Sequence, residues 1–403
     1  MGLNVLFITH LYAPSIGGAE RLFGRIAEGL ARRGRDVTVL TSDALSTEQF
    51  FTRAENRLPR REVRNGVRVI REPIRAPIYG ALKLFDKAAR RLGRLGVFFR
   101  PFVFGPHFTR SFRELVATRF DTVVAGPVPT TAIYYGLLFR RLRRSSRLVF
   151  VPCLHTRDKL HTALANRLAL RRADLVLILS EDEKDYLVRK GVRRDRVLRI
   201  VAAVDDLLLD TPRSVPPLAQ DGAPFLDYVL YLGQEGEHKR IPLLLKAMTA
   251  FWDGGRTTPL VIAGARTRFS ETIDRIIAAL PERHRDRIIR FGDFPEPRKI
   301  GLLDGCRVLV NPSSNESFGI VFLEAWARRK PVIGARVKAV RELIRDGETG
   351  FLFEDRDAAD LEAKIRAILV DPDLARRMGE TGHEDVRSHY RWDLVIDRLA
   401  RSL

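Results

Sequence analysis

The chain has 403 residues, of which 45% are hydrophobic and 30% charged, and its formal net charge is +20. This length exceeds what one hydrophobic core usually supports, so two domains are expected. The composition is that of a soluble globular enzyme and excludes a disordered or fibrous chain. No run approaches the roughly 18 apolar residues needed to cross a bilayer, so any membrane contact is expected to be peripheral.

The amino terminus and the charge bear on location and partners. Residues 1–4 lead directly into the strand-like "VLFI", without the pattern of a signal peptide, which predicts a cytoplasmic protein. The positive charge attracts phosphates in nucleotides, nucleic acid or anionic lipid without choosing among them, and an arginine-rich background is an equally good explanation. Cys153 and Cys306 lack metal-like spacing and are interpreted as buried, reduced thiols.

Apolar strand-like runs alternate with helical patterns along the chain, which predicts parallel sheets covered on both faces. The proline-rich stretch 210–225 reads as a linker between two such series. The prediction is therefore an α/β protein with two Rossmann-like, doubly wound domains, each with its ligand crevice at the carboxyl ends of its strands. The first series contains runs at 3–10, 36–42, 67–72, 121–126, 147–152, 175–180 and 197–204, and the second at 228–234, 259–265, 288–294, 307–313, 330–335 and 350–354.

The stretch "NPSSNESFGIVFLEAWARRKPVIGA", residues 311–335, carries two carboxylates, Glu316 and Glu324, around a predicted helix start. Eight helical residues rise about 12 Å, whereas paired hydrolase carboxylates lie about 5–9.5 Å apart, so hydrolysis is disfavoured. An elongated anionic ligand fits better, with a diphosphate at the amides near Phe318 and Gly319. A nucleotide sugar has this shape. The alternative is that Glu316 caps the helix and Glu324 is solvated.

The stretch "ESFGIVFLEAWARRKPVIGARVKAVRELIRDGETGFLF" strongly resembles the nucleotide-sugar motif of glycosyltransferase family 4, which are retaining enzymes of the GT-B fold. The resemblance covers nearly the whole chain. It implies that Glu316 contacts the donor sugar and Glu324 the nucleotide ribose. It also implies a donor-binding stretch at the helix start, formed by Ser317, Phe318, Gly319 and Ile320.

Two elements of the first half also resemble the family. "HLYAPSIGGAERLFGRIAEGLARRGRDVTVLTS" is similar to its glycine-rich loop and first helix, which implies that Gly17 and Gly18 approach the donor phosphates. Paired glycines alone also mark ordinary turns. His155 ends the run "RLVFVPCLH" and resembles the active-site histidine that the family places beside the donor sugar. A lone histidine after a strand is otherwise more often structural.

In the second half, "YLGQEGEHKRIPLLLKAM" resembles the family's strand, basic loop and helix. Lys239 matches the family lysine, whose charge would stabilise the leaving nucleoside diphosphate. Gln234 stands where the family has an arginine, and Arg240 where glycine is common. The loss of the arginine is expected to weaken this stabilisation unless Arg240 or another basic side chain reaches the same phosphate, and it could reflect a different donor, a relocated cation or a weakened enzyme. "FGDFPEP" resembles the loop beside the nucleotide base, which implies contacts around Phe294.

The end of the chain and one internal segment complete the domain prediction. "HYRWDLVIDRLARSL" resembles the family's closing helix, so the amino-terminal domain is predicted at 1–205 with 383–403 packing back on it, and the donor-binding domain at 206–382. Residues 81–115 interleave basic and aromatic side chains. This pattern suits an interface with anionic lipid or, equally, a helix packed on the first domain with a solvated basic face.

The leading hypothesis is a retaining hexosyltransferase that uses a nucleotide diphosphate sugar and an acceptor hydroxyl on a glycan, a lipid or a small molecule. Catalytic roles fall on His155, Glu316 and Lys239. The resemblance implies no cofactor and no metal, and no Asp-x-Asp motif presents itself as a donor-phosphate metal site. The rivals are a nucleotide-sugar epimerase or phosphorylase on the same fold, and a non-catalytic basic binding protein. No specific nucleic-acid module is recognised.

Overall fold

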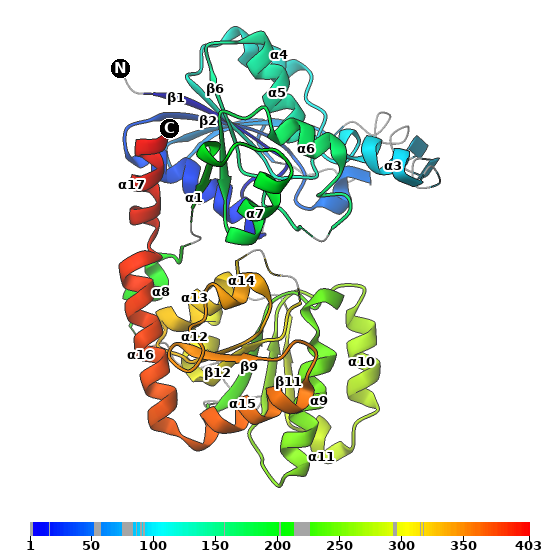
Figure 1. Ribbon diagram of the computed structural model, residues 1–403, viewed down its shortest axis with the longest axis vertical. Coiled ribbons are helices and arrows are strands. Elements are labelled where there is room, and N and C mark those ends of the chain that lie inside the picture. Colours follow the sequence, from blue (N-terminus) through cyan, green and yellow to red (C-terminus); the bar gives the residue numbers. More distant parts are fainter. Residues whose placement is uncertain are drawn as a thin grey trace. The chain divides into compact units, whose positions relative to one another are not determined.

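The computed structural model describes residues 3–15, 17–51, 58–74, 84–85, 87–88, 91, 93–156, 158–200, 203–212, 226–292, 296–314, 316 and 318–403. The chain divides into two compact units (Figure 1). The first contains Met1–Val201 together with Val395–Leu403, and the second contains Ala202–Leu394. Most of the predicted linker, from residue 213 to 225, lies outside the described residues.

The first unit is built on an eight-stranded sheet of order β3-β4-β2-β1-β5-β6-β7-β8. All neighbouring strands are parallel except β3, which runs antiparallel to β4 at the edge. The interior strands are almost wholly buried, as expected for strands covered on both faces. The strands are β1 (Asn4–Thr9), β2 (Asp36–Ser42), β3 (Arg61–Arg64), β4 (Val67–Glu72), β5 (Thr122–Gly126), β6 (Arg147–Phe150), β7 (Leu175–Ile178) and β8 (Val197–Arg199).

Six α-helices are described between these strands. In the first, the apolar face is buried at Leu22, Phe23, Ile26, Ala27 and Leu30, and the helix stops just before Gly34, whose φ of +77° suits glycine. Ala31, next to this face, is only half-buried. The helices are α1 (Gly18–Arg32), α3 (Gly93–Phe99), α4 (Arg110–Ala117), α5 (Ala132–Leu142), α6 (Leu164–Leu170) and α7 (Glu181–Arg189).

The second unit has a fully parallel six-stranded sheet of order β11-β10-β9-β12-β13-β14. Its strands are β9 (Tyr228–Leu232), β10 (Leu260–Ala263), β11 (Ile288–Phe291), β12 (Cys306–Asn311), β13 (Val332–Ala335) and β14 (Gly350–Phe353). Its helices are α8 (Asp206–Asp210), α9 (Ile241–Asp253), α10 (Ser270–Ala278), α11 (Glu282–Arg285), α12 (Glu296–Gly305), α13 (Ile320–Ala327), α14 (Lys338–Arg341), α15 (Ala358–Val370) and α16 (Pro372–His389). The two parallel sheets confirm the predicted fold class.

The last helix, α17 (Trp392–Ser402), contains the boundary at which the chain returns to the first unit. Ile396 and Leu399 are completely buried, and Ile396 packs so close to Gly29 of α1 that a Cβ there would lie 2.6 Å from it. The returning segment is shorter than the predicted 383–403. His383 instead belongs to the second unit, where its Nδ1 lies 3.2 Å from the carbonyl oxygen of Trp326.

The connection into the second unit is held by a buried guanidinium. Arg328 makes a bidentate ion pair with Asp304, with both N–O distances 2.7 Å. The same guanidinium donates to the carbonyl oxygens of Leu208 and Thr211 at 2.9 and 2.8 Å. Charged hydrogen bonds of this kind are stronger than neutral ones. This arrangement fixes the end of α8 to the second unit, which agrees with a unit boundary at 201/202 rather than at the predicted 205/206.

Candidate active site

The candidate site in the second unit lies at the carboxyl ends of β9 and β12, which are neighbours in the sheet. The turn after β9 leads through a short 3-10 helix, η4 (Glu237–Lys239), into α9. The turn after β12 carries Glu316 and leads into α13. Because parallel strands end at one edge, these two turns are brought together although they are almost 80 residues apart in sequence.

The two turns meet in an ion pair. Lys239 Nζ lies 2.5 Å from Glu316 Oε1, and the side chains are only 19% and 12% exposed. Asn311 Nδ2, at the end of β12, donates to the same carboxylate oxygen at 3.1 Å. Burial alone would raise the pKa of Glu316, but the charge and hydrogen bond of Lys239 and the bond from Asn311 lower it below its usual value. Glu316 is therefore held as a carboxylate next to a cation.

One backbone carbonyl ties the turns to each other. The carbonyl oxygen of His238, one residue before Lys239, accepts from the backbone N–H of Ser314 at 3.0 Å and from its hydroxyl at 3.1 Å. The hydroxyl of Ser313 donates to the same oxygen at 3.4 Å. These contacts fix the backbone next to Lys239 and close to Glu316. The backbone of the two turns therefore sets the position of the pair.

The start of α13 has the expected form. Gly319 precedes the helix with φ of +91°, in the left-handed region, and a Cβ at this position would lie 2.7 Å from the Phe322 ring. Phe318 is buried, with its ring centroid 6.1 Å from that of Tyr390. Ile320 is the first residue of the helix, whose first-turn N–H groups point towards its amino-terminal end. Ser317 lies outside the described residues.

Glu324, predicted to contact the ribose, is buried on α13 and pairs with a lysine that the sequence analysis did not single out. Lys299 Nζ, on α12, donates to Glu324 Oε1 at 2.7 Å, and the side chains are 7% and 8% exposed. A solvated Glu324 is therefore wrong. A helix-capping Glu316 is also not observed, because Gly319 is the cap residue and no side-chain cap bond is formed there.

The surroundings of Arg240 and Gln234 bear on whether Arg240 replaces the missing arginine. Arg240 adopts φ of +53°, a left-handed conformation that explains why glycine is common here in the family that the sequence resembles. Its guanidinium is engaged with Asp355 in an ion pair. Gln234 is exposed, and its backbone carbonyl oxygen accepts from the hydroxyl of Tyr231 at 2.8 Å. Arg240 is thus directed to a carboxylate of its own unit.

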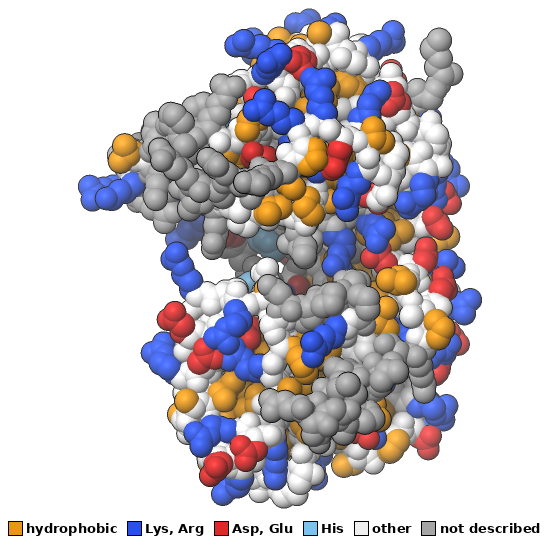
Figure 2. Space-filling model, turned by 180° about the vertical axis from the view of Figure 1, so that it is seen from behind, with side chains coloured by type: hydrophobic (Ala, Val, Ile, Leu, Met, Phe, Trp, Pro, Cys, Tyr) orange, Lys and Arg blue, Asp and Glu red, His pale blue; other side chains and the backbone are white. Residues whose placement is uncertain are grey.

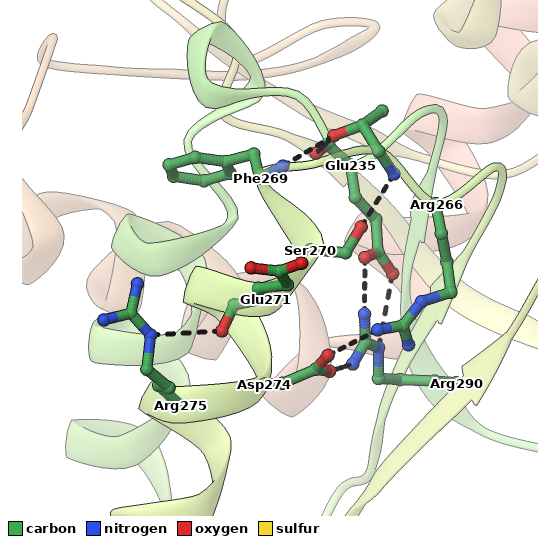
Figure 3. A network of polar contacts seen from close by, with 9 residues as sticks. Glu235, Arg266, Phe269, Ser270, Glu271, Asp274, Arg275 and Arg290 are labelled. Carbon is green, nitrogen blue, oxygen red and sulfur yellow. Dashed lines mark hydrogen bonds and ion pairs between the residues drawn. The ribbon is translucent and has the colours of Figure 1, made fainter.

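A second arginine near this edge is also engaged by carboxylates (Figure 3). Arg290, in β11, donates to both oxygens of Glu235, which is 1% exposed, and to Asp274 of α10. Arg266 pairs with Asp274 from the other side. The hydroxyl of Thr267 donates to the carbonyl oxygen of Glu235 at 2.6 Å. The network connects the ends of β9, β10 and β11 and balances two carboxylates with two guanidinium groups.

In the first unit, Gly17 and Gly18 lie where α1 begins. A Cβ on Gly17 would lie 2.1 Å from the carboxylate of Glu20, whereas Gly18 has open space at that position. Glu20 Oε1 lies 3.2 Å from Nε2 of His10, the residue that follows β1. Burial would raise the pKa of Glu20, but the hydrogen bond and charge of His10 lower it. Gly17 therefore has a steric reason to be glycine, and Gly18 leaves the helix start accessible.

His155 lies in the loop after β6 beside a second histidine. The ring centroids of His155 and His161 are 4.8 Å apart, and the backbone N–H of His155 donates to His161 Nδ1 at 3.3 Å. Burial, and secondly the charge of His155, lower the pKa of His161 to about 4. His161 is thus neutral near pH 7, and its Nδ1 accepts a bond from the loop that carries His155.

A buried carboxylate supports the same loop. Glu183, near the start of α7, accepts from the backbone N–H of Leu154 with one oxygen and from that of Leu179 with the other, at 2.6 Å for Leu179. Burial raises its pKa to about 7, against the lowering effect of these bonds. Next to Leu154, Cys153 has φ of +48° and is a free thiol that is only partly buried, which corrects the prediction of full burial. Cys306 is free and buried as predicted.

Sequence reasoning missed four residues of the site. Asn311, Lys299 and His161 are partners of predicted residues, and Glu183 supports the loop that carries His155. Only Asn311, at the end of an apolar strand, carried a positional signal. Phe294 lies outside the described residues. Within the described ranges, no group of three or more His, Cys, Asp or Glu side chains is arranged to hold a metal ion.

Two family models match the chain, one to each unit. "Glycosyl transferase 4-like domain" matches residues 17–202, and "Glycosyl transferases group 1" matches residues 226–385. The two matches, together with the two parallel sheets, define the class of the protein as a sugar-transferring enzyme with two Rossmann-like domains. The lipopolysaccharide core biosynthesis mannosyltransferase LpcC of Rhizobium leguminosarum bv. viciae is 30% identical over 63% of this chain and 70% of its own length. The chain belongs to glycosyltransferase family 4, of the GT-B fold, and is a glycosyltransferase.

Other relatives match over greater lengths. The glycogen synthase of Mycobacterium tuberculosis is 25% identical over 99% of this chain and 94% of its own. Among solved structures, the sucrose-phosphate synthase of Thermosynechococcus elongatus has a TM-score of 0.74 at 21% identity and covers 100% of this chain and 98% of that one. Anabaena Alr3699/HepE in complex with UDP-glucose has a TM-score of 0.71 at 18% identity, covering 100% and 99%. These two structural likenesses support the fold alone.

Proposed function

We propose that the enzyme transfers a hexose-type sugar from a nucleotide diphosphate donor to an acceptor hydroxyl, with retention of the anomeric configuration. The observation that carries this proposal is the Lys239–Glu316 pair beside the start of α13. A cation, a held carboxylate and first-turn amides within one pair of turns suit a ligand that has a diphosphate next to a sugar. The structures of HepE with UDP and UDP-glucose make nucleotide sugars the donors to test first.

In this reaction the bond between the sugar C1 and the diphosphate oxygen breaks, and the nucleoside diphosphate leaves with the electron pair. The acceptor oxygen bonds to C1 on the face from which the diphosphate departs, and its proton passes to a phosphate oxygen. Lys239 and the α13 amides stabilise the charge that grows on the diphosphate. Glu316 accepts from sugar hydroxyls and supports the positive charge that develops at the ring. No protein nucleophile and no metal is assigned a step.

The other predicted residues take supporting roles in the proposal. Glu324, neutralised by Lys299, contacts the ribose hydroxyls, while Ser317, Ile320 and Phe294 line the donor. Gly17 and Gly18 let the backbone approach the donor phosphates, and His155 contacts the donor sugar and the acceptor region. Since Arg240 pairs with Asp355, Lys239 is proposed as the main cation at the diphosphate. Lipid-linked sugars, such as lipopolysaccharide precursors, and polysaccharide ends are the acceptors to test.

The experiment is a turnover assay on a panel of UDP, GDP, ADP and dTDP sugars, first without and then with candidate acceptors, followed by NMR of the product. The expected result is release of nucleoside diphosphate that depends on an acceptor, with the anomeric configuration of the donor kept in the product. Isomerisation of the donor without an acceptor would identify an epimerase instead. Inversion at the anomeric carbon would refute the retaining mechanism while leaving glycosyl transfer in place.

A further inference from the structure

Exposed apolar side chains gather on one part of the first unit. Of the fourteen large hydrophobic side chains that are exposed in the described part of the chain, eight belong to α3, α5, α6 and the segments next to α3. These eight are Leu84, Phe85, Phe99, Phe102, Leu138, Leu142, Leu164 and Leu168. A monomeric soluble protein exposes single hydrophobic residues routinely, but a concentration of them in neighbouring elements marks an interaction surface.

The aromatic members form a continuous row. The ring centroids of Phe85 and Phe99 are 6.4 Å apart, and Phe98 lies 5.1 Å from Phe99 and 6.1 Å from Phe102. Phe102 stacks on Tyr134 of α5, with 4.3 Å between centroids and an interplanar angle of 31°. The row therefore leads from the α3 segment directly onto α5.

The leucines continue the row along two helices. Leu138 and Leu142 follow Tyr134 at successive four-residue steps, so they share its face of α5. Leu164 and Leu168 share a face of α6 by the same spacing. The hydroxyl of Tyr134 donates to Asn166 of α6 at 2.6 Å, which ties the two helices together. We call these eight exposed side chains and the tyrosine the α3–α5–α6 surface.

Basic side chains border this surface. Arg141, Arg143 and Arg144 are exposed at the end of α5, and Arg171 and Arg172 are exposed after α6. The sequence contains no Asp or Glu between residues 87 and 113 or between 122 and 157. Lys and Arg side chains also occur elsewhere on both units (Figure 2), so the distinguishing feature here is the combination of arginines with exposed leucines and phenylalanines.

We propose that the α3–α5–α6 surface docks the enzyme on an anionic phospholipid bilayer. The leucine and phenylalanine side chains would enter the interface between headgroups and acyl chains, and the arginines would contact lipid phosphates. No helix in the described ranges is long and apolar enough to span a membrane, and the docking is peripheral. The proposal extends the predicted lipid contact of residues 81–115 to α5 and α6, and it is independent of the proposed chemistry because none of these residues has a role in donor binding.

The test is sedimentation of the full chain with vesicles of phosphatidylcholine alone and of phosphatidylcholine mixed with phosphatidylglycerol. We expect binding only to the mixed vesicles. Arg141→Glu with Arg144→Glu should weaken it about thirtyfold or more, since each basic residue near an anionic surface contributes about 1 kcal/mol. Leu164→Ser with Leu168→Ser should weaken it as well. The controls Arg377→Glu and Leu394→Ser, also exposed but in the second unit, should bind like the wild type.

Four results would overturn the proposal. These are equal binding to both kinds of vesicle, no binding to either, variants that bind like the wild type, and controls that lose binding to the same degree as the surface variants. A wild-type dimer that the leucine substitutions dissociate, without vesicle binding, would assign the surface to a second copy of the chain instead. Because vesicle binding is measured without a donor, its failure would leave the proposed glycosyl transfer untouched, and an inactive enzyme that binds vesicles would leave the docking proposal intact.

Discussion

At the scale of single residues, the second unit places each predicted acid next to a lysine. Glu316 pairs with Lys239 in a partly exposed position, whereas Glu324 pairs with Lys299 in a buried one. The difference in burial predicts different consequences of substitution. Removing one partner of a buried pair leaves an uncompensated charge, while a partly exposed pair can be re-solvated.

Lys299→Met is therefore expected to destabilise the second unit by about 3 kcal/mol, because the Glu324 carboxylate stays buried without its cation. All three tryptophans, Trp252, Trp326 and Trp392, belong to this unit, so urea unfolding followed by tryptophan fluorescence reports on it selectively. Lys364→Met is the control, since that lysine is more exposed and 3.9 Å from its partner, and its loss should cost less than about 1 kcal/mol. Equal effects would refute the buried-pair interpretation.

Arg240→Gly tests the assignment of Arg240 to Asp355. A left-handed residue other than glycine costs about 1–2 kcal/mol, and a partly exposed ion pair contributes about 0–1 kcal/mol, so the substitution should be neutral or stabilising by up to about 1 kcal/mol. Turnover should stay within about threefold of the wild type, because Lys239 is the proposed cation at the diphosphate. A loss of turnover of about a hundredfold would show that Arg240 replaces the arginine missing at Gln234.

At the scale of elements, Glu183 joins the loop after β6 to the turn after β7, and its raised pKa makes this contact sensitive to pH. Below about pH 4.5 the carboxyl is protonated in both folded and unfolded chains. Between that value and about pH 7 the unfolded chain releases the proton first, so the free energy of unfolding falls as the pH rises. Above about pH 7 the protonated carboxyl no longer contributes to the free energy of unfolding.

The measurement is calorimetric unfolding from pH 5 to pH 7.5, in which the first unit of the wild type should lose several degrees of Tm that Glu183→Gln does not lose. The variant is expected to start from a lower Tm at pH 5, because an amide cannot accept from both backbone N–H groups. Glu181→Gln, two residues earlier and partly exposed, is the control and should keep the wild-type slope. Parallel slopes for Glu183→Gln and the wild type would contradict this account.

The elements themselves were largely predictable from the sequence, and the reasons differ from one to another. Strands such as β1 and β9 are buried on both faces, so their sequences are almost entirely apolar and stand out. Strand β3, with the sequence REVR and an exposed pattern, was missed because an edge strand needs no apolar run. The α13 start was predictable because Gly319 and the two glutamates lie in one short stretch of sequence, residues 316–324. Lys299 and Glu183 were not, because only the tertiary fold brings them to their partners.

At the scale of the whole molecule, the carboxyl-terminal helices are shared unequally between the two units. Only Val395–Leu403 returns to the first unit, where Asp397 pairs with Arg33 at 2.6 Å and the carbonyl oxygen of Ser402 accepts from Arg147 at 2.5 Å. The family resemblance predicted the return. It could not set its length, because the amphipathic pattern of α16 and α17 does not say which unit each apolar face meets.

Ile396→Ala is expected to destabilise the first unit by about 2–4 kcal/mol, because Ile396 is completely buried against Gly29 of α1. Amide hydrogen exchange should show faster exchange in α1 and little change in the second unit. Leu394→Ala, two residues earlier and 45% exposed, is the matched control and should leave α1 unchanged. If the α1 amides of both variants exchanged as slowly as in the wild type, the carboxyl terminus would contribute little to the stability of the first unit.

The most direct test of the central claim, that the carboxylate of Glu316 acts on the donor sugar beside Lys239, is the turnover of Glu316→Gln with the donor and acceptor found in the panel assay. Glu237→Gln is the control, because Glu237 is exposed in η4, two residues from Lys239. We predict that Glu316→Gln lowers kcat by about a hundredfold to a thousandfold, as the loss of one charge-stabilising group does, while Glu237→Gln stays near the wild type. A Glu316→Gln enzyme with wild-type kcat and KM would contradict the account.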